Sequence, residues 1–213
     1  GNNLFSPGGH SSAFNGYNSG GLLPPATPGG AVGTNVIERF PFSADNSASD
    51  VGDLTQARSS PSSTSSKTAG FNAGGSIVPG FTATNVIDKF PFSSDTNAGD
   101  VGDLTAVTRN HGQGASSQTH GYALGGFSPP IPGSVSTIDK YPFVVDANAT
   151  TIGNLTTAKS ASGGCSSTVN GYNLGGSPGF SNQVEKFPFA TDTNATDVLD
   201  LTVGRFFGAT HSR

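Results

Sequence analysis

The sequence predicts an all-β protein that is built from four consecutive copies of one unit. A hexapeptide made of an aliphatic residue, an acid, a base, an aromatic residue, Pro and Phe occurs four times in the 213 residues. Its copies are residues 37–42, 87–92, 138–143 and 184–189. A period of roughly 50 residues is typical of repeat architectures. No segment shows the 3.6-residue period of an amphipathic helix, so no helix is expected.

The composition excludes several classes of protein. Only 11% of the residues are charged and 33% are hydrophobic, with 31 glycines. Disordered chains combine low hydrophobicity with high charge, whereas here charge is scarce and apolar residues recur at fixed positions. A formal net charge of −4 disfavours nucleic acid as a partner. No apolar run approaches 18 residues, so no membrane span is expected.

The chain ends and the single cysteine give further expectations. No signal peptide is recognised. The sequence begins at Gly1 and has no Met, which indicates a processed product, a fragment, or a sequence lacking its true start. Cys165 is the single cysteine, so no intrachain disulfide can form. It is expected to be a small, buried or half-buried residue.

The domain boundaries follow from the repeats. Residues 1–9 are expected to form an N-terminal arm, and residues 206–213 a C-terminal segment that begins with two adjacent aromatic residues. Residues 10–205 hold the repeats. The four repeats are residues 10–58, 59–109, 110–159 and 160–205.

Each repeat contains four segments of strand character, separated by Gly, Pro, Asn and Asp. The first begins at a pair of small residues, at 11–14, 65–68, 116–119 and 166–169. The second has an aromatic residue followed by a Gly pair, at 16–21, 70–75, 121–126 and 171–176. The third is the hexapeptide. The fourth is an Asp- and Leu-Thr-containing segment, at 50–55, 100–105, 151–156 and 197–202. Four short β segments per repeat predict an up-and-down antiparallel sheet of four strands.

The repeated residues predict specific structural roles. The Gly pair predicts a sharp turn with positive φ. The Pro of each hexapeptide cannot donate a ladder hydrogen bond, which predicts an irregular strand end there. The acid and base of the hexapeptide point to opposite faces and are expected to bridge to neighbouring strands or units. Burial at equivalent places is expected for Phe42, Phe92, Phe143 and Phe189, and for Leu54, Leu104, Leu155 and Leu201.

Acidic and amide residues after each hexapeptide predict turns. Asp45, Asp95, Asp146 and Asp192 precede Asn46, Asn97, Asn148 and Asn194. Asp and Asn close turns by bonding their own backbone. Calcium is an alternative at the pairs Asp50/Asp53, Asp100/Asp103 and Asp197/Asp200, although the third repeat has Thr151 and Asn154 there and calcium needs six to eight oxygens. We predict turn chemistry and no metal site.

One cation follows the last strand segment of every repeat. These cations are Arg58, Arg109, Lys159 and Arg205. A structural link to the carboxylate of the next repeat is expected, with a ligand-binding ring of cations as the alternative. The loops between the second and third segments, residues 22–34 at the longest and 177–183 at the shortest, vary on a constant frame and are candidates for binding.

The sequence contains no recognisable catalytic or metal-binding constellation. His10, His111, His120 and His211 do not recur at one repeat position and lack metal-ligand spacing, so surface or turn positions are expected for them. No Gly-x-Ser-x-Gly elbow occurs. Asn148, Asn154 and Asn194 are glycosylation acceptor sequences that matter only in a secreted protein of a glycosylating source. We therefore predict no catalytic residues, no cofactor-binding residues, no metal and no enzyme.

The order of motifs resembles the kelch repeat of β-propellers, in the Gly pair and the acidic strand that follows it. The kelch Trp is missing, and Leu54, Leu104, Leu155 and Leu201 stand in its place. The units resemble most closely the degenerate kelch-like repeats of tail-fibre and other virion-surface proteins of aquatic phages, cyanophages among them. The resemblance covers about residues 11–205. It implies a kelch-like β-propeller of four four-stranded antiparallel blades; an open β-repeat array and part of a larger propeller are the alternatives.

The resemblance implies a structural or adhesive protein of a virion surface, such as a tail or capsid fibre, located on the virion or outside the cell. The alternatives are a subunit of a cellular extracellular filament or surface layer, and a glycan-directed enzyme or lectin. Expected partners are other copies of the chain, other virion or fibre proteins, and host-surface glycans. Residues 206–213 are expected to pack on the opposite end of the ring or on a neighbouring copy.

Overall fold

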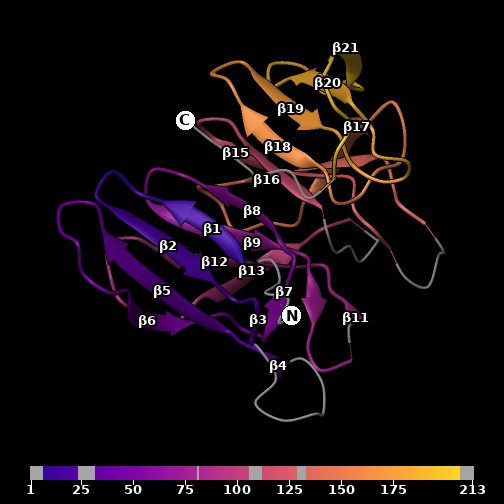
Figure 1. The fold of residues 1–213 in the computed structure, drawn as a ribbon. Coiled ribbons are helices and arrows are strands. Elements are labelled where there is room, and N and C mark those ends of the chain that lie inside the picture. Colours follow the sequence, from indigo (N-terminus) through magenta and orange to yellow (C-terminus); the bar gives the residue numbers. More distant parts are fainter. Residues whose placement is uncertain (1–6, 24–31, 81, 106–111, 129–132, 207–213) are drawn as a thin grey trace.

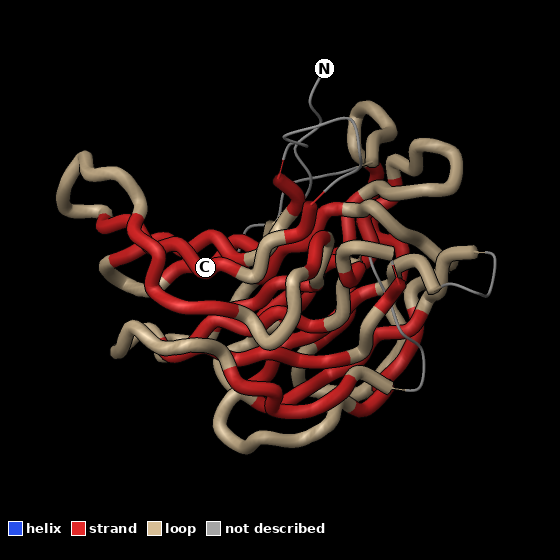
Figure 2. The backbone as a smooth tube through the Cα atoms, turned by 90° about the horizontal axis from the view of Figure 1, so that it is seen from below, coloured by secondary structure: helices blue, strands red, loops and turns tan. Residues whose placement is uncertain are grey.

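The computed structural model describes residues 7–23, 32–80, 82–105, 112–128 and 133–206. These residues form 21 β-strands, and no helix occurs among them (Figure 2). The described part of the chain therefore includes no helix capable of spanning a membrane. The all-β class predicted from the sequence is confirmed.

Sixteen of the strands form four antiparallel sheets of four strands, which we call units 1 to 4. Unit 1 contains β1 (Gly8–Ser11), β2 (Asn15–Ser19), β5 (Val36–Pro41) and β6 (Ser49–Asp53). Unit 2 contains β8 (Ser62–Ser65), β9 (Ala69–Ala73), β12 (Val86–Pro91) and β13 (Gly99–Asp103). Unit 3 contains β14 (Gln113–Ser116), β15 (His120–Leu124), β16 (Thr137–Pro142) and β17 (Thr150–Asn154). Unit 4 contains β18 (Gly163–Ser166), β19 (Asn170–Leu174), β20 (Gln183–Pro188) and β21 (Thr196–Asp200).

The units follow one another in a row through their first strands. β1 packs beside β8, β8 beside β14, and β14 beside β18. No comparable packing joins the described strands β1 and β18. Units 1 and 4 accordingly lie at opposite ends of the molecule (Figure 1). Each inner unit has two neighbouring units, whereas units 1 and 4 each have one.

The first strand of each unit lies about three residues earlier than predicted. The Ser pairs end the first strands and begin the hairpin turns, so the arm predicted for residues 1–9 already contributes Gly8 and Gly9 to β1. The reason is a local hydrogen bond: the Ser12 hydroxyl accepts the backbone N–H of Asn15. Such a side-chain bond to the backbone favours a turn over a continued strand.

The Gly pair after the second strand has positive φ in all four units, as predicted. In unit 2 the φ values are 68° at Gly74 and 107° at Gly75. An added Cβ at Gly75 would lie 2.9 Å from the Ser59 carbonyl oxygen, so the turn is crowded as well as left-handed. The variable loop that follows carries short strands, which are β3 (Leu22–Leu23) and β4 (Val32–Gly33) in unit 1 and β10 (Ser76–Ile77) and β11 (Thr82–Ala83) in unit 2. A further short strand, β7 (Arg58–Ser59), lies between β6 and β8 and pairs with β10.

The hexapeptide forms the third strand of every unit. Each strand ends at the Pro, as Pro91 does in β12, so the missing donor falls at the strand end. The irregularity of the ladder lies elsewhere, since the register between β12 and β13 shifts between Ile87 and Asp88. The same shift occurs at the aliphatic–acid step of the other three units.

The hydrophobic cores lie between the units. Phe71 and Leu104 of unit 2 cluster with Tyr141 and Phe143 of unit 3. Equivalent clusters join unit 1 to unit 2 and unit 3 to unit 4. Because a unit buries its apolar faces only against a neighbour, the outer faces of units 1 and 4 keep theirs exposed.

This arrangement corrects the predicted equivalence of the Phe and Leu sites. Phe143 is buried and Phe92 and Phe189 are half-buried, but Phe42 is 57% exposed. Leu54, Leu104 and Leu155 are buried, whereas Leu201 is half-buried. The exceptions belong to the outer faces of units 1 and 4, which no other unit of the described chain covers.

The predicted C-terminal segment begins with an aromatic contact within unit 4. The rings of Phe206 and Phe180 have centroids 4.5 Å apart. Phe206 thus packs against the loop that precedes β20 of the nearest unit. Residues 1–6 and 207–213, with the rest of the expected arm and segment, lie outside the described residues.

Candidate functional site

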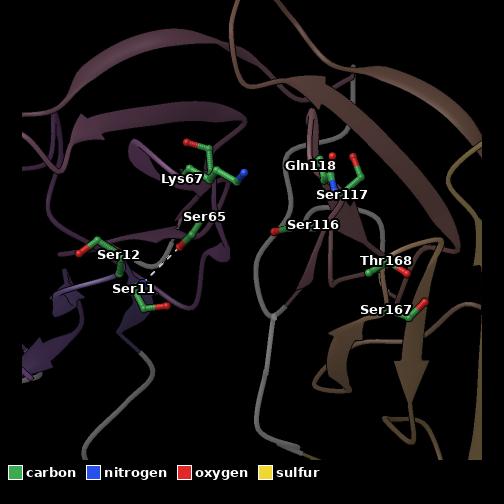
Figure 3. Close-up of a pocket in the computed structure, with 11 residues that line it drawn as sticks. Ser11, Ser12, Ser65, Lys67, Ser116, Ser117, Gln118, Ser167 and Thr168 are labelled. Carbon is green, nitrogen blue, oxygen red and sulfur yellow. Dashed lines mark hydrogen bonds between the residues drawn. The ribbon is translucent and has the colours of Figure 1, made fainter.

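A hollow of about 500 Å³ lies where the four first hairpins of the units turn. Its described walls are the turns between β1 and β2, β8 and β9, β14 and β15, and β18 and β19 (Figure 3). Most of the lining residues are serines. The hollow is therefore a concave, hydroxyl-rich surface to which all four units contribute.

Four of these seven serines hold the turns and are not free for a ligand. Ser12, Ser66, Ser117 and Ser167 each accept a backbone N–H from the residue three positions later. Serines of the first strands tie neighbouring units together, because the hydroxyl of Ser65 accepts the N–H of Ser11 and that of Ser166 accepts the N–H of Ser116. The Ser pair recurs because one serine joins neighbouring units and the other, which we call the turn serine, holds the hairpin turn.

The residue after each turn serine (Ser12, Ser66, Ser117 and Ser167) differs from unit to unit. Ala13, Lys67, Gln118 and Thr168 occupy this position, and all four line the hollow with exposed side chains. Together they present one cation, one amide, one hydroxyl and one methyl group on a constant backbone. Variation on a constant, concave frame is the arrangement in which binding specificity usually resides. The sequence predicts strands at these residues and binding on other loops, so this site could not be found from the pattern of repeats.

A second set of polar groups holds the units together and is buried. Asp88, Asp139 and Glu185, the acids of the last three hexapeptides, have no exposed surface. Each accepts hydrogen bonds from the Thr that ends the preceding unit; these are Thr55, Thr105 and Thr156. Each carboxylate is therefore bound across a junction between units.

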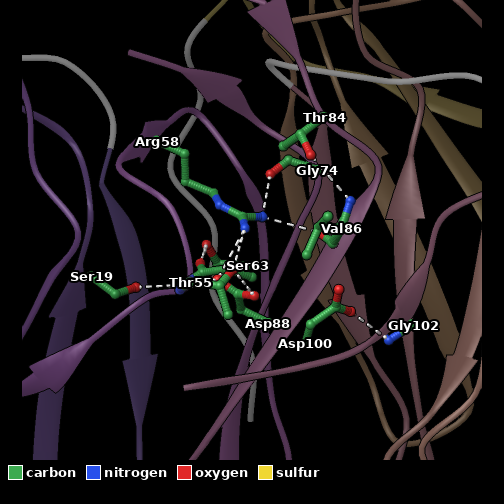
Figure 4. A network of polar contacts seen from close by, with 11 residues as sticks. Ser19, Thr55, Arg58, Ser63, Gly74, Thr84, Val86, Asp88, Asp100 and Gly102 are labelled. Atoms are coloured by element: carbon green, nitrogen blue, oxygen red, sulfur yellow. Dashed lines mark hydrogen bonds and ion pairs between the residues drawn. The ribbon is translucent and has the colours of Figure 1, made fainter. Parts of the chain in front are cut away.

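Arg58 completes the junction between units 1 and 2 (Figure 4). Its Nη2 lies 3.0 Å from Oδ2 of Asp88, and its Nη1 donates to the carbonyl oxygens of Gly74 and Val86. Burial lowers the pKa of Arg58, against the opposing effect of Asp88. Lys159 lies 2.8 Å from Glu185 in the equivalent place between units 3 and 4. The predicted link from each cation to the next repeat's carboxylate is confirmed for these two; Arg109 lies outside the described residues.

The base of each hexapeptide makes the other predicted bridge, at the surface. Arg39 pairs with Asp95, Lys89 with Asp146, and Lys140 with Asp192, always in the next unit. The prediction that acid and base bridge to neighbouring units is confirmed at all three junctions. Three of the four Asp residues assigned to turns, Asp95, Asp146 and Asp192, are partners for these cations.

The Asn residues also bond across junctions, which corrects their predicted role. The Oδ1 atoms of Asn97, Asn148 and Asn194 accept the N–H of the last residue of the preceding fourth strand. Unit 1 differs, because the position equivalent to Asn97, Asn148 and Asn194 is Ser47, and Asn46 lies one residue before it. These turns therefore bind the neighbouring unit through their Asn side chains.

The histidine predictions hold only in part. His10 is buried, against expectation, between Thr64, Ser19 and the ring of Phe90. Burial lowers its pKa to about 4. His120 is half-buried, and burial lowers its pKa. His111 and His211 lie outside the described residues.

Three acids of the alternative calcium pairs have structural partners. Asp50 and Asp100 accept the N–H of the Gly two residues later, and Asp197 accepts from Gln183. No group of three or more metal-ligating side chains occurs in the described part of the chain. Cys165 is half-buried, as expected. The three glycosylation acceptors Asn148, Asn154 and Asn194 are exposed, and their modification stays a prediction.

Comparisons with known proteins identify a structural likeness alone. No protein-family model matches the chain, and no curated protein matches it. The solved structure of YjhT superimposes with a TM-score of 0.76 at 10% sequence identity, over 94% of this chain and 72% of the other. At that identity the likeness concerns the fold. About a quarter of the YjhT chain has no counterpart here.

Proposed function

We propose that this chain is a non-enzymatic adhesive and structural protein of a virion surface, such as a tail or capsid fibre component. In this proposal the four units are blades of a kelch-like β-propeller arrangement. The row of sheets joined through their first strands, with cores between sheets, supports that architecture. The resemblance of the repeats to those of phage surface proteins supports the location.

The observation that carries the adhesive role is the hydroxyl-lined hollow with its four differing residues. Lys67, Gln118 and Thr168 offer donors and acceptors on turns that serine hydrogen bonds already hold, which lowers the entropic cost of ordering them on binding. Such groups suit a ligand that is itself rich in hydroxyls, such as a host-surface glycan. The described lining residues include no carboxylate pair, which the usual glycoside hydrolysis requires. Binding without turnover is therefore the chemistry that the hollow supports.

A glycan panel tests the adhesive role. The purified chain is applied to immobilised neutral and acidic oligosaccharides, together with the variant carrying Lys67→Ala and Gln118→Ala. At least one glycan should bind, and the variant should bind it about tenfold or more weakly, since two hydrogen-bonding groups are lost. Thr68→Ala, on the same turn but not in the lining, serves as the matched control. If the unmodified chain, the double variant and the control bind the glycan equally, the hollow is not the binding site.

Two further measurements test the rest of the proposal. Incubation with the bound glycan should release no product; hydrolysis that one point substitution abolishes would show an enzyme. Antibodies against the chain should label virus particles in electron micrographs. Labelling of cellular filaments or a surface layer would overturn the virion assignment.

A further inference from the structure

The outer faces of units 1 and 4 carry the two halves of the junction that joins neighbouring units inside the molecule. We propose that these faces dock head-to-tail with a second copy of the chain, the outer face of unit 4 in one copy against the outer face of unit 1 in the next. This inference is independent of the glycan-binding hollow. It rests on what is buried at the three internal junctions and exposed at the two ends.

Aromatic residues that are paired at the internal junctions lack ring partners from another unit of the described chain on the two outer faces. Inside the molecule, Tyr17 of unit 1 stacks on Phe92 of unit 2 with ring centroids 4.6 Å apart, and Tyr122 stacks on Phe189 at 4.9 Å. The equivalent tyrosine of unit 4, Tyr172, is half-buried and has no ring partner among the described residues. On unit 1, Phe40 and Phe42 are 41% and 57% exposed and contact only each other among described rings.

The charged residues that form buried pairs at the internal junctions are exposed on the two outer faces. Glu38 of unit 1 is exposed, although the equivalent Asp88, Asp139 and Glu185 are fully buried. Arg205 follows unit 4 as Arg58 follows unit 1, but it is exposed, and within the described residues its side chain donates to the nearby Val203 carbonyl oxygen alone. The junction geometry thus pairs Arg205 of one copy with Glu38 of the next.

The surface bridges repeat the same complementarity. At each internal junction the hexapeptide base of one unit binds the Asp that follows the next unit's hexapeptide, as Lys140 binds Asp192. Lys186 of unit 4 and Asp45 of unit 1 are the remaining base and acid, and no ion pair joins either to another described residue. Opposite charges and matching aromatic groups on two different faces favour a heterologous contact between copies.

One residue departs from the internal pattern. Leu199 of unit 4 occupies the place of Gly52, Gly102 and Gly153. An added Cβ at Gly102 would lie 2.6 Å from the Ala147 carbonyl oxygen of the next unit. Leu199 therefore prevents the closest approach seen inside the molecule and holds the two copies slightly apart at this point. A head-to-tail contact of this kind closes into a ring or continues as a filament, according to the rotation it imposes.

Charge reversal tests the contact, with sedimentation velocity as the readout. The wild-type chain should associate as concentration rises. Glu38→Arg or Arg205→Glu alone should weaken association about thirtyfold or more, because each places like charges together in the contact. The protein carrying both substitutions should regain association close to wild type. Leu199→Gly should strengthen it, and Lys67→Ala, in the hollow, should leave it unchanged.

Cross-linking tests the direction of the contact. Single cysteines are introduced at Asp45 or at Lys186 in a chain that carries Cys165→Ser, and a short bismaleimide is added. The mixture of the two proteins should cross-link, and each protein alone should not. The proposal would be overturned if the wild-type chain and Leu199→Gly both stay monomeric at the highest attainable concentration. It would also be overturned if the double charge reversal does not restore association, or if either cysteine variant cross-links with itself. None of these results depends on glycan binding.

Discussion

The junction between units 2 and 3 and the outer face of unit 1 are made of equivalent residues in different surroundings. In the junction, Phe143 packs against Phe71 with ring centroids 4.8 Å apart, and Asp139 has no exposed surface. On the outer face, the equivalent Phe42 and Glu38 are exposed. The same repeat position is thus core in one unit and surface in another. The contribution of a residue to stability is set by the neighbouring unit, and four predictions test this.

The largest effect is expected at the buried ion pair. Asp88→Ala leaves the Arg58 guanidinium buried without its counter-charge and should lower the free energy of unfolding by about 3–5 kcal/mol. Glu38→Ala removes the equivalent acid from an exposed site and should change it by less than about 0.5 kcal/mol. Urea denaturation of dilute protein measures both. Similar losses for the two variants would show that the outer face is not different from the junction.

The aromatic contact comes next. Phe143→Ala empties a site between Phe71 and Tyr141 and should cost about 3–4 kcal/mol. Phe42→Ala should cost less than about 0.5 kcal/mol in dilute protein, because that residue is 57% exposed and Phe40 is its only contact among the described rings. Denaturation of the two variants under the same conditions gives the comparison. A large loss for Phe42→Ala in the monomer would reveal a contact that the structure does not contain.

Protonation of His10 should weaken the junction between units 1 and 2. The pKa of His10 is lowered to about 4 from 6.5 because the ring is buried. The unfolded chain therefore takes up a proton at a higher pH than the folded chain, and this part of the stability is lost as pH falls from about 6.5 to 4. The loss should be about 2–3 kcal/mol.

A pH series of urea denaturations measures that loss, with His10→Gln as the control. The variant should lose most of this pH dependence, even if it is less stable at neutral pH. The same slope in both proteins would assign the dependence to other groups.

The smallest effect is expected at the surface bridges. Lys89 and Asp146 join units 2 and 3 with an N–O distance of 2.8 Å, but the Asp146 side chain is 60% exposed. Lys89→Ala should cost at most about 1 kcal/mol, and the cost should shrink at high salt because exposed charges are screened. Denaturation at low and high salt tests this. A loss as large as that of Asp88→Ala would place the bridge among the buried pairs.

Much of the fold was predictable because its signals are local. Alternation and turn residues in each repeat placed the second, third and fourth strands of every unit, and the Gly pairs required left-handed turns. The first strands were placed too late, because the Ser pair was interpreted as strand when its hydroxyl favours a turn. The side chains around the hollow, such as Lys67 and Gln118, were not recognised for the same reason.

The sequence by itself determined the repeat, the all-β class, the positions of most strands and the partners of the repeated charges in general terms. The tertiary structure alone decided which copies of those residues are buried. Phe42 and Phe143, or Glu38 and Asp139, occupy the same place in their repeats, and no local signal separates them. Burial depends on whether another unit packs on that face, which is a contact between residues about fifty positions apart. Only the arrangement of the units in space determines it.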